Sequence, residues 1–571
     1  MNSGMLKLTL LLLLAATCAT CSAPATVPPS VNSSEPEMQA DDQEHAPPGY
    51  YENLPQETYV PGQYDARFRP KFHFTPQSGW MNDPNGMVYF AGEWHLFYQH
   101  YPDGNEWGPM HWGHAVSTDL VAWEELPIAL YPDEKGYIFS GSAVVDAKNL
   151  SGFGKGGEPP LVAMFTYHDM AAEKAGKTDF QSQGIAYSND RGRTWTKYAG
   201  NPVIPNRRNK DFRDPKVLWN EKRQEYTMVL AAADHVEFYA SPDLKNWTYL
   251  SSFGKDQPEQ FGVWECPELI PMQIEETGED AYLLIVSTNK GNPNGGSGTF
   301  YYTGHWDGEN FTKLTETAYN TPGTKWLDYG RDNYAAVSFA NVPDGDGRTI
   351  MIGWMSNWEY AQEVPTEAWR SAMTVPREVT LHDTEFGYRI RQRPVRELEK
   401  LRGERIELGT DYLEDGLTTV DLSELEHPGV FELKFSIDMH GNSESLYFTL
   451  TDAESKDFYR FGVERGPNGA SDKWLFTSRD FAGLREFDED FTRDELTYLE
   501  RFSQSSVIDF HVFFDKTSAE LFLDDGLTVA TDIFFPTTDF TKLTIEVNGG
   551  RADMDGYLGF SVDDWRLHEL K

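Results

Sequence analysis

Cysteine is scarce in this sequence, with three residues in 571. Cys18 and Cys21 lie at the end of an N-terminal apolar segment, so Cys266 is the only cysteine in the rest of the chain. A single thiol cannot form an internal disulfide, which excludes a fold built on a disulfide framework. We expect mature domains without an internal disulfide.

Basic residues are also few. The chain has 49 Lys and Arg against 90 Asp and Glu, a formal net charge of −41 at pH 7. This balance disfavours nucleic acid or an anionic membrane as a partner, and it says little about a neutral substrate. It is typical of the solvated acidic surface that keeps a secreted protein soluble, with adaptation to a saline habitat as the alternative.

Long apolar runs are absent except at the N-terminus. Lys7 precedes an apolar run over 8–16, and small residues follow. This layout predicts a secretory signal peptide over 1–23, and the run is too short for a transmembrane span. We therefore expect a secreted or extracellular protein. The alternative is a cell-surface or periplasmic lipoprotein with its lipid anchor at Cys18 or Cys21, although residues 15–17 match the usual lipoprotein box poorly.

Helical periodicity is rare as well, while the chain contains 48 Gly and 33 Pro and 14% aromatic residues. This mixture predicts an all-β fold with many turns. The length exceeds that of one ordinary core, so at least two domains are expected. Changes in composition and apolar periodicity along the sequence predict a disordered linker at 24–66, a first domain at 67–395 and a second domain at 400–571.

The first domain contains internal repeats. Four segments share Ser-x-Asp or a looser form of it, then a short turn and an aromatic residue: 117–123, 188–195, 241–247 and 305–311. Asp83-Pro84, Asp214-Pro215 and Cys266-Pro267 each precede two apolar strands, and two further units without the Pro begin near Phe139 and Asn333. Five such units predict a five-bladed β-propeller, in which equivalent repeat starts converge on the central axis. Asp83, Asp214 and Glu265 should then surround one funnel.

The second domain alternates apolar and polar residues with a period of two. Its expected strands are 431–437, 445–450, 458–461, 508–513, 518–523 and 542–547. This pattern predicts an antiparallel β-sandwich. It contains no catalytic constellation, which favours a packing or carbohydrate-surface accessory role.

The octet Gly79–Gly86, Gly-Trp-Met-Asn-Asp-Pro-Asn-Gly, holds a carboxylate at a stiff corner. Pro84 fixes its own φ and restricts Asp83 to extended conformations, while Asn85 and Gly86 tolerate a positive φ. A rigid corner suits a catalytic group. Considered alone, the same octet also fits an Asx turn that opens a hairpin.

Three of the repeat starts carry a family resemblance: Trp-Met-Asn-Asp-Pro-Asn-Gly at 80–86, Phe-Arg-Asp-Pro at 212–215 and Trp-Glu-Cys-Pro at 264–267. These blocks resemble the signatures of glycoside hydrolase family 32, the invertases, inulinases and levanases. Supporting blocks occur in the order of the family at 97–99, 105–108, 111–114, 139–142, 329–332 and 352–358. The resemblance covers both domains and implies a five-bladed propeller followed by a β-sandwich. Within the family, 262–269 and 369–373 look most like exo-acting inulinases and levanases.

The resemblance also implies roles for three carboxyl groups. Asp83 would attack the ketose C2, Glu265 would act as acid and then base, and Asp214 would stabilise the transition state without forming a bond. Retaining glycosidases use such a pair of carboxyls. Arg213 beside Asp214 would help to fix its charge, although strand alternation suggests that the two side chains point to different sides.

Substrate contacts follow from the same blocks. Trp107 and Trp354 would stack on the furanose, and Phe139 belongs to a matching block. The expected partners of sugar hydroxyls are Asn82, Gln99, Ser140 and Asp332, and a turn cap is the alternative for Asp332.

No metal site or cofactor is expected. His111 and His114 would lie on opposite faces of a strand, and the acidic segment 344–347 lacks the further spaced ligands of a calcium loop. Cys266 lacks a paired His in its motif and is interpreted as a small buried residue rather than a nucleophile. Glu268 lies an odd number of positions from Glu265 and is not assigned to catalysis.

The sequence therefore predicts an exported exo-β-fructosidase that releases terminal fructose, with retention, from inulin, levan or sucrose. A sucrose-preferring invertase with the same machinery is one alternative. The other is a fructan-binding surface protein that has lost its activity.

Overall fold

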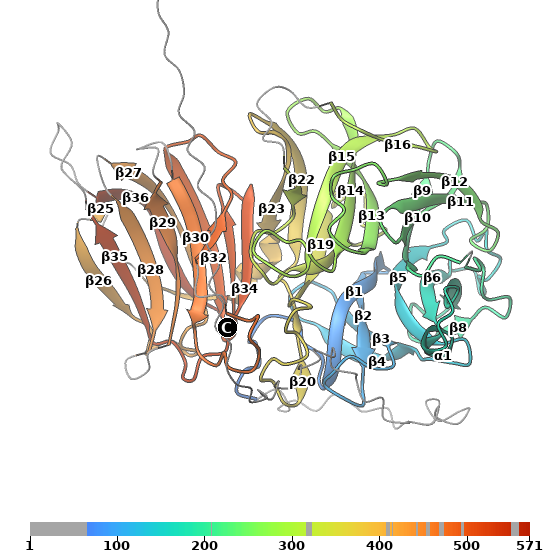
Figure 1. Cartoon of the computed structure of the whole chain (residues 1–571), viewed down its shortest axis with the longest axis horizontal. Coiled ribbons are helices and arrows are strands. Elements are labelled where there is room, and N and C mark those ends of the chain that lie inside the picture. Colours follow the sequence, from blue (N-terminus) through green and yellow to red (C-terminus); the bar gives the residue numbers. More distant parts are fainter. Residues whose placement is uncertain are drawn as a thin grey trace, which may run out of the picture. The chain divides into compact units, whose positions relative to one another are not determined.

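The structure is a computed structural model that describes residues 66–570 except 207, 316–322, 407–411, 414, 441–443, 453–456, 467–472, 493–495 and 550–558. The predicted signal peptide, the lipid-anchor cysteines and nearly all of the predicted linker lie outside the described residues. Two domains rich in β-structure follow each other along the chain (Figure 1). Neither half contains a helix longer than six residues in the part described.

Five antiparallel sheets form the first domain. The first contains β1 (Gly79–Phe90), β2 (Glu93–Tyr101), β3 (His111–Ser117) and β4 (Glu124–Leu130), and the second contains β5 (Tyr137–Val145), β6 (Leu161–His168), β7 (Gln181–Ser188) and β8 (Thr196–Lys197). The third contains β9 (Phe212–Asn220), β10 (Glu225–Ala232), β11 (Val236–Ser241) and β12 (Thr248–Phe253).

The last two sheets carry short additional strands. The fourth contains β13 (Trp264–Gln273), β14 (Asp280–Thr288), β15 (Gly298–Trp306) and β16 (Phe311–Lys313), with β17 (Lys325–Trp326) paired to β15. The fifth contains β18 (Tyr334–Ser338), β19 (Thr349–Met355), β22 (Arg377–Thr384) and β23 (Gly387–Pro394), with β21 (Ala372–Met373) paired to β19. Helix α1 (Met170–Lys174) follows β6, and Asp169 caps it by accepting from the Ala172 amide.

The five sheets close into a ring. Strand β1 packs against β5, β5 against β9, β9 against β13, β13 against β18, and β18 again against β1. In addition, β20 (Trp369–Arg370) pairs in parallel with the start of β1. A closed ring of few-stranded sheets is a β-propeller, so the predicted five-bladed architecture is confirmed.

The Ser-x-Asp repeat forms the turn between the third and fourth strands of three blades. In the first blade the Asp119 carboxylate accepts from the amides of Val121 and Ala122, and Asp243 accepts equivalently from Lys245 and Asn246 in the third. The tryptophans that follow, at 123, 195 and 247, are half-buried and pack against the core. The repeat is therefore structural.

The second domain is a two-sheet sandwich, as predicted. One sheet has the order β24 (Arg402–Ile406), β36 (Gly559–Leu570), β27 (Phe431–His440), β32 (Val507–Asp515), β33 (Ser518–Leu523) and β34 (Thr528–Ile533), with β25 (Tyr412–Leu413) paired to β36. The other has the order β26 (Gly416–Asp421), β35 (Lys542–Asn548), β28 (Ser445–Thr451), β29 (Phe458–Arg465), β30 (Lys473–Phe481) and β31 (Thr497–Leu499). Phe435, Phe448, Phe461 and Phe510 pack between the sheets, and the 3₁₀ helix η2 (Arg396–Leu401) connects the two domains.

Buried charges join the propeller to the sandwich. The His73 ring lies between the carboxylates of Asp515 and Glu520, at 2.8 and 2.7 Å. Arg377 on β22 bonds to Glu520 at 2.5 Å and to Asp328 at 3.0 Å. Burial alone would lower the pKa of His73, but its two carboxylate partners raise the pKa to about 9. His73 is therefore a buried cation at neutral pH.

Candidate active site

Every innermost strand of the propeller has an irregular register near its start. In β1, Asn82 and Asp83 lie opposite the single residue Gln99, and Ser140 is the extra residue in β5. The register shifts similarly at 214–215 in β9, 266–267 in β13 and 335–336 in β18. Such bulges re-aim side chains and are common at functional sites. They turn residues from all five blades toward one another.

Three of the bulges contain a non-glycine residue with positive φ. The values are 63° for Asp214, 44° for Cys266 and 52° for Ala335. This conformation costs roughly 1–3 kcal/mol for an L-residue, so the surrounding structure must hold it in place.

Asp83 lies at the centre of the site and is 8% exposed. Its Oδ1 accepts from Asn82 Nδ2 at 3.0 Å and its Oδ2 from Ser140 Oγ at 2.7 Å. The thiol of Cys266 also points at Oδ2, with the sulfur 3.4 Å away. Burial raises the pKa of Asp83, and the negative charge of Glu265 adds to that effect. The hydrogen-bond donors favour the ionised form and oppose the shift.

Asp214 is the second buried carboxyl. Its Oδ2 accepts from the Cys266 amide at 2.9 Å, with the Cys266 sulfur 3.7 Å away, while its own amide donates to Thr166 Oγ1 at 3.0 Å. Burial raises the pKa of Asp214 to about 7, although the charge of Arg213 opposes the shift. Cys266 therefore bridges Asp83 and Asp214, and burial together with these carboxylates raises the pKa of its thiol. This thiol is a hydrogen-bond donor and not a nucleophile.

Glu265 has different surroundings. Arg213 donates to its Oε1 from Nε at 3.1 Å and from Nη2 at 3.0 Å, and the Tyr334 hydroxyl donates to its Oε2. Its side chain is 19% exposed, more than the other two carboxyls. The site thus contains two buried carboxyls and a third that reaches solvent.

The structure refines the predicted equivalence of the three carboxyls. Glu265 is the last regular residue before the bulge of β13, as Arg213 is in β9 and Tyr334 in β18. Cys266, and not Glu265, holds the position that Asp214 occupies in β9. The hydrogen bonds of Arg213 go to Glu265, Asp211 and Gln181, so it binds the neighbouring carboxyl while acting on Asp214 through charge.

Two predicted substrate contacts have unused donors. Gln99 and Trp354 are 2% and 0% exposed, and Gln99 Nε2 and Trp354 Nε1 have no hydrogen-bond partner among the residues that the structure describes. Gln99 lies opposite the bulge of Asp83, and Trp354 is paired with Tyr334. Buried donors without a partner are uncommon, and a bound ligand with hydroxyl groups would satisfy them.

Trp107 and Phe139 form an aromatic pair. Their ring centroids are 5.9 Å apart in an edge-to-face arrangement, and Phe139 stacks on His168 at 4.2 Å. Ser140, the next residue after Phe139, donates to Asp83. Phe139 is thus part of β5, the strand whose Ser140 donates to Asp83, and Trp107 contacts Phe139.

Asp332 is not brought to this cluster. It is fully buried and accepts from Tyr360 at 2.6 Å, from the Ile533 amide at 2.9 Å and from Arg479. Arg479 and Ile533 of the sandwich both bond to Oδ2, while Oδ1 accepts from Tyr360 of the first domain, so both carboxylate oxygens have partners. The predicted role of Asp332 as a partner of sugar hydroxyls therefore has no support in its position.

Sequence reasoning missed Tyr334 and Thr166. Tyr334 could have been found by aligning the unit that starts near Asn333 with the others, since it occupies the place of Arg213 and Glu265. Thr166 carries no motif. Glu268 is not part of this cluster: its carboxylate pairs with Lys216 at 2.8 Å and accepts from the Ser338 amide at 2.7 Å.

The described residues contain no group of three His, Cys, Asp or Glu side chains that could hold a metal ion. Within them, no helix has the length and apolarity needed to cross a membrane.

Comparison with protein-family models decides the family. Residues 73–394 match the glycosyl hydrolases family 32 N-terminal domain and residues 397–563 match the C-terminal domain of the same family. The chain belongs to glycosyl hydrolase family 32. The family resemblance predicted from the sequence is thereby confirmed.

Relatives of this family 32 chain are named as levanases and inulinases. A levanase of Bacillus subtilis is 44% identical over 89% of this chain and 71% of its own length. An extracellular exo-inulinase of Aspergillus awamori is 36% identical over 86% of this chain and 94% of its own. A crystal structure of exo-inulinase from the same fungus superimposes with a TM-score of 0.78 at 33% identity, covering 89% of this chain and 99% of that one. The chain is therefore a family 32 hydrolase, and its named relatives are β-fructosidases of the levanase, exo-inulinase and invertase type.

Proposed function

We propose that this family 32 protein is a secreted exo-β-fructosidase that hydrolyses terminal β-D-fructofuranosyl residues of fructans and sucrose with retention of configuration. The observation that carries the proposal is the contrast between Asp83 and Glu265. Asp83 is buried among donors that favour its carboxylate, while Glu265 is more exposed and held from two sides by Arg213 and Tyr334.

In the first step, the Asp83 carboxylate attacks C2 of the fructosyl unit as the bond from C2 to the leaving oxygen breaks. Glu265 gives its proton to that oxygen, which yields a fructosyl ester on Asp83. In the second step, a water oxygen attacks C2, Glu265 takes the water proton, and the ester bond to Asp83 breaks. Fructose leaves, and both carboxyls return to their starting states.

The electrostatic coupling between Asp83 and Glu265 is compatible with these two roles. The negative charge of Glu265 is one cause of the raised pKa of Asp83. When Glu265 holds its proton, this repulsion disappears and Asp83 ionises more readily. The coupling therefore disfavours the state in which both carboxyls are ionised, as a mechanism that needs one carboxylate and one carboxylic acid requires.

The remaining residues would bind the sugar. Asp214 would accept its hydroxyls and stabilise the positive charge that develops at the ring. Gln99 Nε2 and Trp354 Nε1 supply unused donors, and Trp107 with Phe139 supplies an apolar wall for the ring or the leaving group.

A substrate panel tests the proposal. Purified enzyme is given sucrose, inulin and levan, products are resolved over time, and the anomer first released is identified by NMR. Fructose as the sole early product from polymers, released as the β-anomer, is the expected result. Internal cleavage or inversion would contradict it.

A sucrose-preferring invertase is the second candidate, because an invertase of Kluyveromyces lactis is 33% identical over 85% of this chain and 90% of its own length. The same panel separates the two: negligible rates on both polymers would favour the invertase. Secretion is supported by the extracellular relatives, and mass spectrometry of the mature N-terminus distinguishes a free protein from one lipidated at Cys18 or Cys21.

A further inference from the structure

The segment between β19 and β21, residues 356–371, contacts β1 and contains β20, which pairs in parallel with the start of that strand. We call it the tryptophan segment. Its Trp358 ring stacks on Trp80, with centroids 6.0 Å apart and 28° between the planes, and lies 4.8 Å from Trp354. Trp80 Nε1 in turn donates to Asn82 Oδ1 at 2.7 Å, and Asn82 donates to Asp83. Trp358 therefore supports the group that orients the proposed nucleophile.

The same segment also contacts the loop between β2 and β3. Gln362 Oε1 accepts from the Trp107 amide at 3.1 Å, and the Asn105 side chain donates to the Glu367 carbonyl. Both Trp107 and Trp354, the two tryptophans proposed to face the sugar, thus contact the tryptophan segment. Its position determines the shape of the site on two sides.

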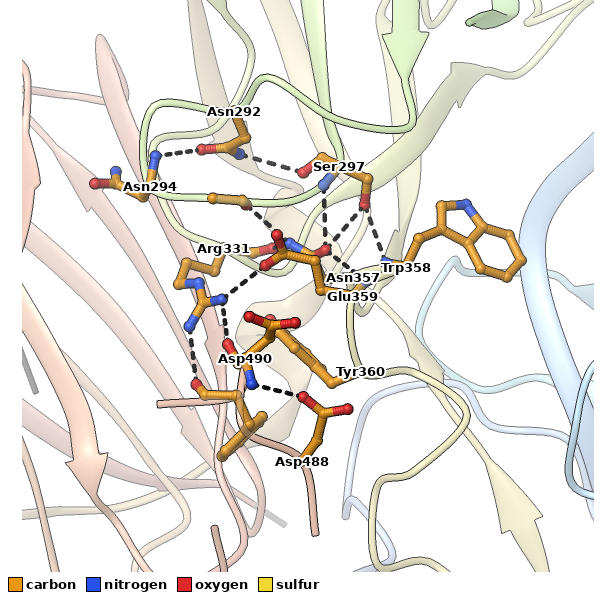
Figure 2. Close-up of polar contacts among 12 residues, drawn as sticks. Asn292, Asn294, Ser297, Arg331, Asn357, Trp358, Glu359, Tyr360, Asp488 and Asp490 are labelled. Atoms are coloured by element: carbon orange, nitrogen blue, oxygen red, sulfur yellow. Dashed lines mark hydrogen bonds and ion pairs between the residues drawn. The ribbon is translucent and has the colours of Figure 1, made fainter. Parts of the chain in front are cut away.

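Arg331 ties this segment to the sandwich (Figure 2). Its Nη1 donates to the Phe491 carbonyl at 2.8 Å, and its Nη2 donates to the Asp490 carbonyl at 2.7 Å and to Glu359 Oε2 at 3.1 Å. Glu359 directly follows Trp358. Arg331 is 3% exposed, so these bonds are sheltered from water.

The polar contacts of Asn357 complete the connection (Figure 2). Its Nδ2 donates to the Arg331 carbonyl at 2.8 Å, and its Oδ1 accepts from the Ser297 amide at 3.1 Å. Ser297 Oγ then accepts from the Trp358 amide at 3.1 Å. Ser297, in the loop after β14, therefore holds the Trp358 amide, and the Arg331 carbonyl holds the side chain of the preceding residue, Asn357.

A second arginine makes the reciprocal contact from the sandwich. Arg479 donates to the Tyr360 hydroxyl at 2.8 Å, to the Phe491 carbonyl at 3.1 Å and to Asp332. The Phe491 carbonyl thus accepts from one arginine of each domain. Each planar guanidinium group fixes several partners at once, which makes the network rigid.

We infer that the sandwich positions the catalytic site through Arg331 and the tryptophan segment, and that Arg331 is a positioning residue for the hydrolysis. The inference rests on the proposed function and extends it: the second domain sets the geometry of Asp83 and of the sugar-facing tryptophans. A displacement of the tryptophan segment by an ångström would shift both Asp83 and the sugar-facing tryptophans, and such displacements can lower rates by up to about 10²-fold.

The test compares Arg331→Lys with Arg377→Lys in the full chain. Both arginines are buried at the domain contact, but the hydrogen bonds of Arg377 go to Glu520, Asp328, Gln392 and Thr531 and not to the tryptophan segment. Lysine keeps the charge and loses the fork. For each variant, Tm, near-ultraviolet circular dichroism, and kcat and KM on sucrose are measured well below Tm.

We expect both variants to lose stability, and only Arg331→Lys to lose kcat/KM, by about 10- to 100-fold. Its tryptophan dichroism should change too, because Trp358 shifts against Trp80. If Arg331→Lys does not fold, Glu359→Gln weakens one of the three bonds and should give a smaller loss of the same kind. Equal kcat/KM losses in the Arg331 and Arg377 variants, or none in either, would overturn the inference. An inactive wild-type enzyme would instead overturn the proposed function.

Discussion

Arg213 and Glu265 occupy equivalent positions in adjacent blades, and the guanidinium of Arg213 donates two hydrogen bonds to Oε1 of Glu265. Each is the last regular residue before a bulge. Tyr334 holds the same place in the next blade and donates to the other oxygen. The propeller repeat thus places an arginine, a glutamate and a tyrosine in contact, although more than 100 residues separate the first from the last.

Replacing Asp83 with Ala should abolish hydrolysis. In the proposed mechanism the substitution removes the atom that bonds to C2, and loss of a nucleophile lowers kcat by on the order of 10⁴-fold or more. Sucrose hydrolysis by the purified variant measures the effect. Asp119→Ala, in an exposed turn of the same blade, serves as the control and should retain the wild-type rate. Substantial residual activity in Asp83→Ala would remove this residue from the mechanism.

Glu265→Ala should affect substrates according to their leaving groups. Proton donation contributes about 10²- to 10⁴-fold, and a leaving group that departs as a stable anion does not need it. We expect a large fall in kcat on sucrose and a much smaller one on an aryl fructoside with an acidic phenol. Equal losses on both substrates would argue against proton transfer by Glu265.

Tyr334→Phe removes one hydrogen bond to Glu265 while keeping the ring. A hydrogen bond to a charged group is worth about 1.5–3 kcal/mol, which corresponds to a roughly 10- to 100-fold fall in kcat/KM if it orients the acid. Tyr302→Phe is a matched control, because the Tyr302 hydroxyl donates to Glu259 elsewhere in the propeller. Similar kinetics for the two variants would show that the contact of Tyr334 is not used in catalysis.

Asp214→Asn should lower the activity and raise the stability at alkaline pH. Burial raises the pKa of Asp214 to about 7, so the folded state binds a proton that the unfolded state releases near pH 4. The stability that this proton gives is complete below pH 4 and is lost as the pH rises to 7. The variant mimics the protonated form: its Tm should exceed that of wild type at pH 8 and match it at pH 4, while kcat falls by about 10²- to 10³-fold. A lower Tm at pH 8 would contradict this interpretation.

His73→Gln should destabilise the domain contact in a pH-dependent way. The carboxylates of Asp515 and Glu520 overcome the effect of burial and raise the pKa of His73 to about 9, above its unfolded value of 6.5. The contribution of His73 is therefore complete below pH 6.5 and is lost as the pH rises through about 9. Breaking a buried pair costs about 3–5 kcal/mol. Urea unfolding at pH 6 and pH 10 should show a large difference from wild type at the first and a small one at the second; a constant difference would refute the charged state of His73.

The fold and the proximity of Asp83 to Asp214 could be predicted from the sequence, because each depends on short repeated patterns. Asp-Pro at 83–84 and 214–215 and the Ser-x-Asp turns recur at fixed places in the blades. Segments that repeat along the chain therefore occupy equivalent positions in the propeller. Alternation of apolar residues likewise indicated the sandwich strands.

Partners of individual side chains could not be predicted in the same way. Each bulge shifts the alternation by a residue, so a rule of odd and even positions fails at 82–83, 214–215 and 266–267. This is why the contact between Arg213 and Glu265 and the role of Tyr334 were missed. Asp332 was misplaced for another reason: its partners Arg479 and Ile533 come from the second domain, and no local pattern shows which surface that domain covers.

The parallel pairing of β20 with β1 has a consequence for biosynthesis. Gly79 pairs with Trp369, so the strand of Asp83, which has β2 on one side, gains its second neighbour only after 290 further residues have been made. At the usual rates of translation this takes roughly 15 to 60 s. A nascent chain stalled before residue 356 lacks both β20 and the tryptophan segment, so the enzyme should become active only after the fifth blade has been made and the ring has closed onto β1.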